Sequence, residues 1–254
     1  MNMKDVKAIT IPEGAVKQIQ DSNGNIIWGS QSAFPYRRLE YIHFSGTEYI
    51  DTAWISSNPS RYYKIEASIT EYRAGRLLSS YDGTAANAAR RFYLPEFNNN
   101  GMHACLGGTW GSYLWTAADV PLNTKLTVEG VWSKSTNNVL NWSVSGTGIT
   151  TVSETITGTS TTLSPAQRYY LFATNDNGSP NYNYALIGNL YGAERRNTDS
   201  SGALNAKFIP CQRKSDNVCG VYDAINNLFR PMQGTNITTQ AAGPVVDEYW
   251  DLTA

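Results

Sequence analysis

The chain has few of the residues on which enzymes and metal-binding proteins commonly depend, because its 254 residues include only three cysteines and two histidines. An odd number of cysteines in a chain of this length is not typical of a fold stabilised by disulfides, and no pair of Cys or His residues has the spacing of a zinc site. Neither His43 nor His103 has a Ser or Cys nucleophile near it in a recognisable elbow. We therefore expect no catalytic residues, no metal and no cofactor, and we interpret both histidines as hydrogen-bonded strand residues.

The chain also lacks an excess of charge and any long apolar run. Its net charge is −1 and its pI is about 6.1, and its lysines and arginines are scattered, so no extended positive field would hold a polyanion. The N-terminal residues 1–16 lack the apolar core of a secretory signal, and no run is long enough to cross a bilayer. We therefore expect no nucleic-acid partner, no membrane insertion and synthesis in the cytoplasm without a signal peptide.

Alternation of apolar and polar residues, the period of a β-strand, dominates the rest of the chain. Leu126, Val128 and Trp132 fall on one face of a strand, and the run 140–144 alternates in the same way. Shorter runs of this kind lie at 48–55, 61–69, 91–94, 150–157, 169–174 and 184–191, separated by clusters of Gly, Asn and Ser. Many short strands joined by such turns predict an all-β fold, an antiparallel two-sheet jelly-roll sandwich.

The first 30 residues are expected to form a separate unit. Two strands, 16–20 and 25–28, are joined through Asn23-Gly24, a dipeptide typical of tight hairpins. A lone hairpin is at best marginally stable in water, so its apolar side chains need another surface to cover them. Those side chains are Ile19, Ile26, Ile27 and Trp28. We divide the chain into an anchoring or assembly segment, 1–30, and a jelly-roll domain, 31–254; the alternative is that the hairpin is only an extra edge of that domain.

Aromatic residues are unusually plentiful, with 16 tyrosines and 7 tryptophans. Tyr and Trp combine a flat apolar face with a polar tip, which suits stacking on sugar rings as well as protein interfaces. The loop-like segment GGTWGSYLW at 107–115 is where we expect an exposed cluster, and SPNYNY at 179–184 is a second candidate. The predicted glycan-binding residues are Trp110, Tyr113, Trp115, Tyr182 and Tyr184. Burial in the core or between subunits is the alternative role for these rings.

The segment 207–223, KFIPCQRKSDNVCGVYD, predicts two strands around a polar turn. A hairpin centred on Ser215 would place Cys211 opposite Cys219, where a disulfide is geometrically allowed. We nevertheless expect a pair of small buried thiols, since disulfides rarely persist in a reducing cytoplasm.

Several stretches also carry a resemblance to a known family. They are LEYIHFSGTEYIDTAW at 39–54, YYLFATNDNGS at 169–179, ALIGNLYGAE at 185–194 and FIPCQRKSDNVCGVYDAINNLFRP at 208–231. Together they resemble the concanavalin-like (LamG-like) jelly-roll domains of phage and prophage structural proteins, over about residues 36–246. The chain departs from that pattern at Cys219, where similar sequences carry an aliphatic residue, and in 247–254, which run past the family's ending.

The resemblance implies a non-enzymatic virion protein, a head or tail fibre or capsid-decoration subunit made in the host bacterium. Its outward lectin-like domain would attach to bacterial surface glycans, and its N-terminal segment would bind other virion proteins. We expect the copies to associate as a homotrimer, because several weak sites held together bind more strongly than one. A purely architectural role in the capsid or tail is the alternative.

Two further patterns are weighed against the resemblance. Glu66 and Glu71 have the outer spacing of the carboxylates in concanavalin-like glycoside hydrolases, which makes a glycan-cleaving enzyme the other alternative. Ser68 stands where that family has an Asp, and without a bulge the two glutamates lie on opposite faces of a strand. The segment NDNG at 175–178 offers oxygen ligands that calcium prefers, but it also has the composition of a tight turn, which is the structure we expect.

Overall fold

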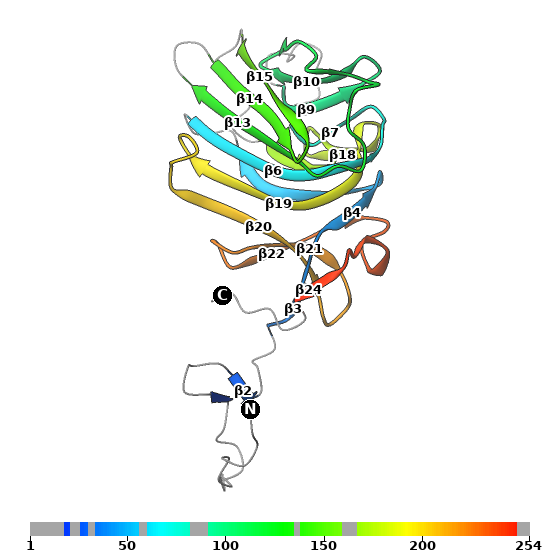
Figure 1. Ribbon diagram of the computed structural model, residues 1–254, viewed down its shortest axis with the longest axis vertical. Helices are drawn as coiled ribbons and strands as arrows, with labels where there is room; N and C mark the ends of the chain where they lie inside the picture. The colour runs from blue at the N-terminus through cyan, green and yellow to red at the C-terminus, as the bar shows by residue number, and fades with distance from the viewer. Residues whose placement is uncertain are drawn as a thin grey trace, which may run out of the picture.

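The computed structural model describes residues 18–20, 26–29, 34–55, 60–81, 91–134, 138–158 and 167–247. These residues form a sandwich of two antiparallel sheets, a jelly roll (Figure 1), which confirms the predicted fold class. Two short 3₁₀ turns, η3 (Tyr182–Tyr184) and η4 (Thr239–Ala241), accompany the strands, and the described part of the chain contains no α-helix. Within these ranges there is accordingly no helix with the length and apolar character needed to span a membrane.

The larger sheet has eleven strands. They are β3 (Tyr36–Leu39), β4 (Ile42–Ser45), β6 (Ser60–Glu71), β13 (Leu126–Lys134), β14 (Asn138–Gly146), β15 (Ile149–Gly158), β19 (Ile187–Asn197), β20 (Leu204–Arg213), β21 (Cys219–Asp223), β22 (Leu228–Pro231) and β24 (Val245–Asp247). Their order is β15-β14-β13-β6-β19-β20-β21-β22, with β4 paired to β19, and with β3 paired to both β20 and β24.

The smaller sheet has nine strands. They are β5 (Glu48–Ile55), β7 (Gly75–Arg76), β8 (Leu78–Ser80), β9 (Phe92–Asn98), β10 (Gly101–Leu106), β11 (Thr109–Trp110), β12 (Trp115–Thr116), β16 (Arg168–Leu171) and β23 (Gln233–Gly234). Their order is β11-β10-β9-β8-β16-β5-β23, with β12 paired to β10 and β7 to β9. A separate hairpin joins β17 (Thr174–Asp176) to β18 (Ser179–Asn181).

The core lies between the two sheets and is built from alternate residues of each strand. Leu126, Val128 and Trp132 of β13 are buried there, as their spacing predicts. Aromatic rings stack between the sheets: Phe44 of the larger sheet lies 4.0 Å, centroid to centroid, from Phe172 beside β16. Burial of these faces leaves the opposite face of each sheet for solvent or for a ligand.

The β20–β21 hairpin forms as predicted, but its register differs from the expected one. Gln212 lies opposite Cys219, and Cys211 lies opposite Gly220, so the two cysteines are not cross-strand partners. The backbone N–H of Arg213 donates to the Val218 carbonyl at 2.8 Å, which leaves a four-residue loop, 214–217, in place of an odd-numbered one centred on Ser215. One residue of shift turns a side chain to the other face of a sheet. Both cysteines are therefore buried free thiols on opposite faces.

The predicted N-terminal hairpin is present in the backbone. Strands β1 (Gln18–Gln20) and β2 (Ile26–Gly29) pair antiparallel, with Ile19 opposite Trp28. They form a two-stranded sheet of their own that pairs with no other described strand. The side chains of Ile19, Ile26, Ile27 and Trp28 lie outside what the structure describes. Their predicted role in anchoring or assembly stays a prediction.

Candidate functional site

A pocket of about 670 Å³ opens on the outer face of the smaller sheet. Its floor is one transverse row of side chains on three adjacent strands, because Arg76 of β7 pairs with Glu96 of β9, which pairs with His103 of β10. We call this site the aromatic pocket. It is lined chiefly by Arg76, Glu96, His103, Trp110, Tyr113 and Tyr184.

The floor of the aromatic pocket is a buried charged row. Arg76 Nη2 lies 3.1 Å from Glu96 Oε1, and His103 Nε2 lies 3.6 Å from Glu96 Oε2. All three residues are more than nine-tenths buried. Charges withdrawn from water need partners, and the guanidinium and carboxylate supply them to each other. The row is therefore set in place by strand register before any ligand arrives.

Aromatic rings enclose the Arg76 end of the row. The Arg76 guanidinium carbon lies 3.8 Å from the centre of the Tyr93 ring and 4.0 Å from that of Tyr184. Arg76 Nη1 also donates to Thr174 Oγ1 at 2.8 Å. A guanidinium held between two ring faces gains cation–π attraction on both sides, so Arg76 is fixed in position.

Two more rings enclose the His103 end of the row. The imidazole is stacked between Trp110, at 4.9 Å, and Tyr113, at 4.6 Å between ring centroids. Both outer rings come from the segment that leaves β10, pairs with it again as β11, and returns to it as β12. Trp110 and Tyr113 are each 42% exposed. One face of each ring is covered by His103, and Trp110 also lies 5.7 Å from Tyr93 between ring centroids; the exposed part of each ring is available to a ligand at the mouth of the pocket.

The structure brings together three of the five predicted glycan-binding residues. Trp110, Tyr113 and Tyr184 all line the aromatic pocket. Trp115 packs against the main core, and Tyr182 lies beside Tyr49, 6.2 Å between ring centroids, outside the pocket. The distinction arises because β12 turns Trp115 inward, while the 3₁₀ turn η3 rotates Tyr184 by two-thirds of a turn from Tyr182.

The walls of the aromatic pocket supply further polar groups. Arg91 lies over the Tyr81 ring at 4.8 Å, and Asp176 accepts a hydrogen bond from Asn181 Nδ2 at 3.3 Å. Arg76 and Arg91 balance Glu96 and Asp176 in formal charge. The pocket thus offers donors and acceptors in similar measure, with aromatic faces at its mouth, which suits a ligand rich in hydroxyl groups.

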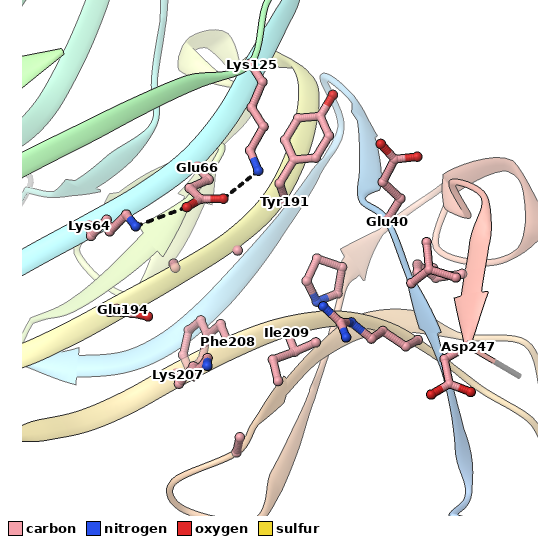
Figure 2. Close-up of a pocket in the computed structure, with 17 residues that line it drawn as sticks. Glu40, Lys64, Glu66, Lys125, Tyr191, Glu194, Lys207, Phe208, Ile209 and Asp247 are labelled. Carbon is pink, nitrogen blue, oxygen red and sulfur yellow. Dashed lines mark ion pairs between the residues drawn. The ribbon is translucent and has the colours of Figure 1, made fainter. Parts of the chain in front are cut away.

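A second hollow, of about 650 Å³, lies on the outer face of the larger sheet. We call it the sheet groove; Lys64, Glu66, Tyr191 and Lys207 line it (Figure 2). Figure 2 shows Glu66 between two lysines: its carboxylate lies 3.1 Å from Lys64 Nζ and 2.6 Å from Lys125 Nζ. Burial acts to raise the pKa of Glu66, but the hydrogen bonds and charges of the two lysines outweigh it and hold that pKa below its usual value.

The carboxylates of the hydrolase alternative do not meet in this groove. Glu66 lines it, whereas Glu71 is exposed at the end of β6 and is not among the lining residues, although the β6–β19 register shifts beside Glu71. Ser68 is buried and accepts a hydrogen bond from Asn189 Nδ2 at 3.3 Å. A carboxylate kept ionised by two lysines is a poor general acid, because it has no proton to give.

The oxygen-rich segment 175–178 forms the tight turn between β17 and β18. Asn177 and Gly178 have φ values of 52° and 89°, and Gly178 N donates to Asn175 Oδ1 at 2.7 Å. Asn175 is thus engaged by the turn itself, while Asp176 accepts a hydrogen bond from Asn181 and Asn177 accepts one from Gln167. Within the described ranges, His, Cys, Asp and Glu side chains nowhere gather in a group of three that would hold a metal ion.

Sequence reasoning missed the charged floor of the aromatic pocket. Arg76 and Glu96 stand twenty residues apart in short strands with no clear alternation, and His103 was interpreted as an ordinary hydrogen-bonded strand residue. Only strand register shows that the three share a row. The aromatic segment 107–115, by contrast, was visible in composition alone.

No protein-family model matches the chain, and no curated protein matches its sequence. Among solved structures, the CBM40 domain of the Ruminococcus gnavus IT-sialidase, solved with α2,3-sialyllactose bound, is 19% identical at a TM-score of 0.45, covering 61% of this chain and 89% of that one. A SAP-like pentraxin from Limulus polyphemus is 11% identical at a TM-score of 0.40, and the match covers 63% of this chain and 76% of that one. Mouse laminin α1 domains LG4-5 are also 11% identical at a TM-score of 0.40, and the match covers 67% of this chain and 41% of that one. Likenesses of this size concern the sandwich fold alone and say nothing of a ligand.

Proposed function

We propose that this protein is a non-enzymatic glycan-binding protein whose ligand occupies the aromatic pocket. The observation that carries the proposal is the pair of half-exposed rings, Trp110 and Tyr113, at the mouth of a pocket whose charged floor is already paired and buried. Sugars present apolar C–H faces and polar hydroxyls together, and this combination of ring faces and hydrogen-bonding walls complements both.

The wider setting that we propose is the surface of a phage particle, as a head or tail fibre or a capsid-decoration subunit. It rests on the resemblance of residues 36–246 to phage jelly-roll domains and on the hairpin β1–β2, which has no partner strand among the described residues. In this proposal residues 1–30 join the copies, as a homotrimer, to one another and to other virion proteins. Several copies would raise the strength of attachment to bacterial surface glycans.

Catalysis is not part of the proposal, because Glu66 is ion-paired with two lysines and Glu71, its partner in the hydrolase pattern, does not line the sheet groove. Release of reducing ends from a bacterial polysaccharide, lost on Glu66→Gln, would contradict this view. Unchanged release in the variant would point to contamination by another enzyme.

The test of glycan binding is an array of bacterial surface glycans, probed with the purified full-length protein and with single variants. We expect Trp110→Ala and Tyr113→Ala to weaken the strongest interaction at least about ten-fold, since each removes a stacking face. Tyr182→Ala is the matched control, because Tyr182 is similarly exposed but lies outside the pocket. Thermal melts establish that each variant is folded.

Two results would overturn the proposal. A folded protein that binds no glycan would favour a purely architectural role in the capsid or tail. Binding that Tyr182→Ala abolishes and Trp110→Ala leaves intact would move the site to the Tyr49–Tyr182 side of the sheet.

A further inference from the structure

His103 supports the two aromatic rings at the mouth of the aromatic pocket, Trp110 and Tyr113. Its ring fills the space between Trp110 and Tyr113, with interplanar angles of 11° and 19°, so the three rings form one nearly parallel stack. Only 5% of His103 is exposed. Removing or moving this ring would leave both outer rings without the surface that positions them.

The hydrogen bonds of the stack fit an unprotonated Nε2. Asn98 Nδ2 lies 3.1 Å from His103 Nε2 and 3.1 Å from the Tyr113 hydroxyl. An amide N–H donates to a ring nitrogen only when that nitrogen carries no proton. In this state Glu96 Oε2, buried 3.6 Å from the same Nε2, has no hydrogen-bond partner.

A proton on Nε2 would reverse this arrangement. Two donors, Asn98 Nδ2 and Nε2–H, would then face each other, while Nε2–H would gain the unused acceptor Glu96 Oε2. The imidazolium would also be a cation between two ring faces, which attract it. The new ion pair draws His103 toward Glu96, and the cation–π attraction holds Trp110 and Tyr113 more firmly against the imidazolium, while Asn98 Nδ2 keeps its hydrogen bond to the Tyr113 hydroxyl.

The titratable and charged groups around His103 come from several elements. Glu96 and Tyr93 lie on β9, Arg76 on β7 beyond Glu96, Tyr113 between β11 and β12, and Arg91, Tyr81, Asp176 and Tyr184 on the pocket walls. Among them Glu96 is the carboxylate in contact with the ring, and one of its two oxygens is already taken by Arg76. The remaining oxygen is the one that a proton on His103 would engage.

We propose that His103 is a positioning residue of the aromatic pocket whose protonation locks Trp110 and Tyr113 in place, so that the pocket binds its glycan more tightly in mildly acidic than in alkaline solution. The proposal rests on the proposed function for its ligand, but not for the change in the protein. Histidine is the side chain that proteins most often use to change charge near neutral pH. A wall that is already rigid costs a ligand less entropy to bind.

The first experiment needs no ligand. The chain has only two histidines, so the His43→Gln variant leaves a single imidazole, that of His103, to follow by NMR. We expect its titration to move the Tyr113 and Trp110 ring signals with it. Amide protection factors at 110–114, which correct for the intrinsic effect of pH on exchange, should rise about three- to five-fold between about pH 8 and about pH 5.5, the size of one cation–π contact. Equal protection at both pH values, or the same rise in His103→Gln, would overturn the proposal.

The second experiment measures affinity for the strongest glycan of the array at the same two pH values. We expect the wild type to bind about three- to five-fold more tightly at the lower pH. His103→Phe keeps a flat ring in the stack without a proton to gain, so it should bind at both pH values with no difference between them. Tight binding that does not vary with pH in the wild type would contradict the role of His103 alone. Absence of any glycan ligand, with the protection change present, would contradict the proposed function alone.

Discussion

Glu48 carries a buried charge outside the aromatic pocket. It is fully buried, and its carboxylate accepts hydrogen bonds from Ser45 N at 2.7 Å, Thr47 Oγ1 at 2.6 Å and Asn236 N at 3.1 Å. Burial acts to raise the pKa of Glu48, but the hydrogen bonds from Thr47, Ser45 and Asn236 outweigh it and lower that pKa. A carboxylate supplied with this many donors stabilises the fold only while it is ionised.

We expect Glu48→Gln to lower the free energy of unfolding by about 2 kcal/mol at neutral pH, because an amide cannot accept all of these bonds. Since the folded-state pKa lies below the unfolded one, the stabilisation is present above the unfolded pKa and is lost as pH falls through the folded pKa. The wild type should therefore lose more stability between about pH 5 and about pH 3 than the variant does. Urea unfolding across this range checks the expectation, with the exposed Glu40→Gln as control; parallel pH curves would contradict it.

At the scale of elements, the β9–β10 hairpin supports the aromatic pocket through Gly101. Its φ is 141°, and a Cβ built there would lie 2.0 Å from the Trp115 carbonyl oxygen. Gly148, in the turn between β14 and β15, also has a positive φ, 76°, but a Cβ there meets nothing within 4 Å. A side chain at either position would strain the backbone, but only a side chain at Gly101 would also collide with a neighbouring strand.

Gly101→Ala should cost more than about 2 kcal/mol and should weaken glycan binding, because β12 and the segment carrying Tyr113 must move away. Gly148→Ala should cost only about 1 kcal/mol, the penalty for a left-handed backbone alone. Thermal melts and array binding of both variants provide the comparison. Equal losses of stability would show that the collision is relieved elsewhere.

The elements also show where sequence reasoning succeeds and where it stops. Strands with one buried face, such as β13 and β14, could be predicted because Leu126, Val128 and Leu140 alternate with polar residues. Register could not be predicted: a four-residue loop in place of an odd-numbered one put Cys219 opposite Gln212. The row Arg76–Glu96–His103 is formed by the register of three strands, so it cannot be predicted from the periodicity within any one strand.

At the scale of the whole molecule, the sandwich should fold without its N-terminal hairpin. Strands β1 and β2 pair only with each other among the described strands, so their removal exposes no sheet edge of the sandwich. We expect deletion of residues 1–30 to leave the melting temperature within about 2 °C of the full-length value, while light scattering shows a loss of association. An oligomer that survives the deletion would contradict the assembly role of this segment.

Strands β23 and β24 each add to one sheet of the sandwich by pairing with a strand from early in the chain. Strand β23 pairs with β5, β24 pairs with β3, and Asn236 N binds Glu48, 188 residues away in the sequence. Contacts between such distant parts of a chain form slowly, because a long loop must close before they are gained. During synthesis β3 and β5 must therefore wait, unpaired at these positions, until residues 233–247 have left the ribosome. A chain truncated before Gln233 would lack β23 and β24, so the Glu48 carboxylate would lose its Asn236 donor and two strand edges would be open to aggregation.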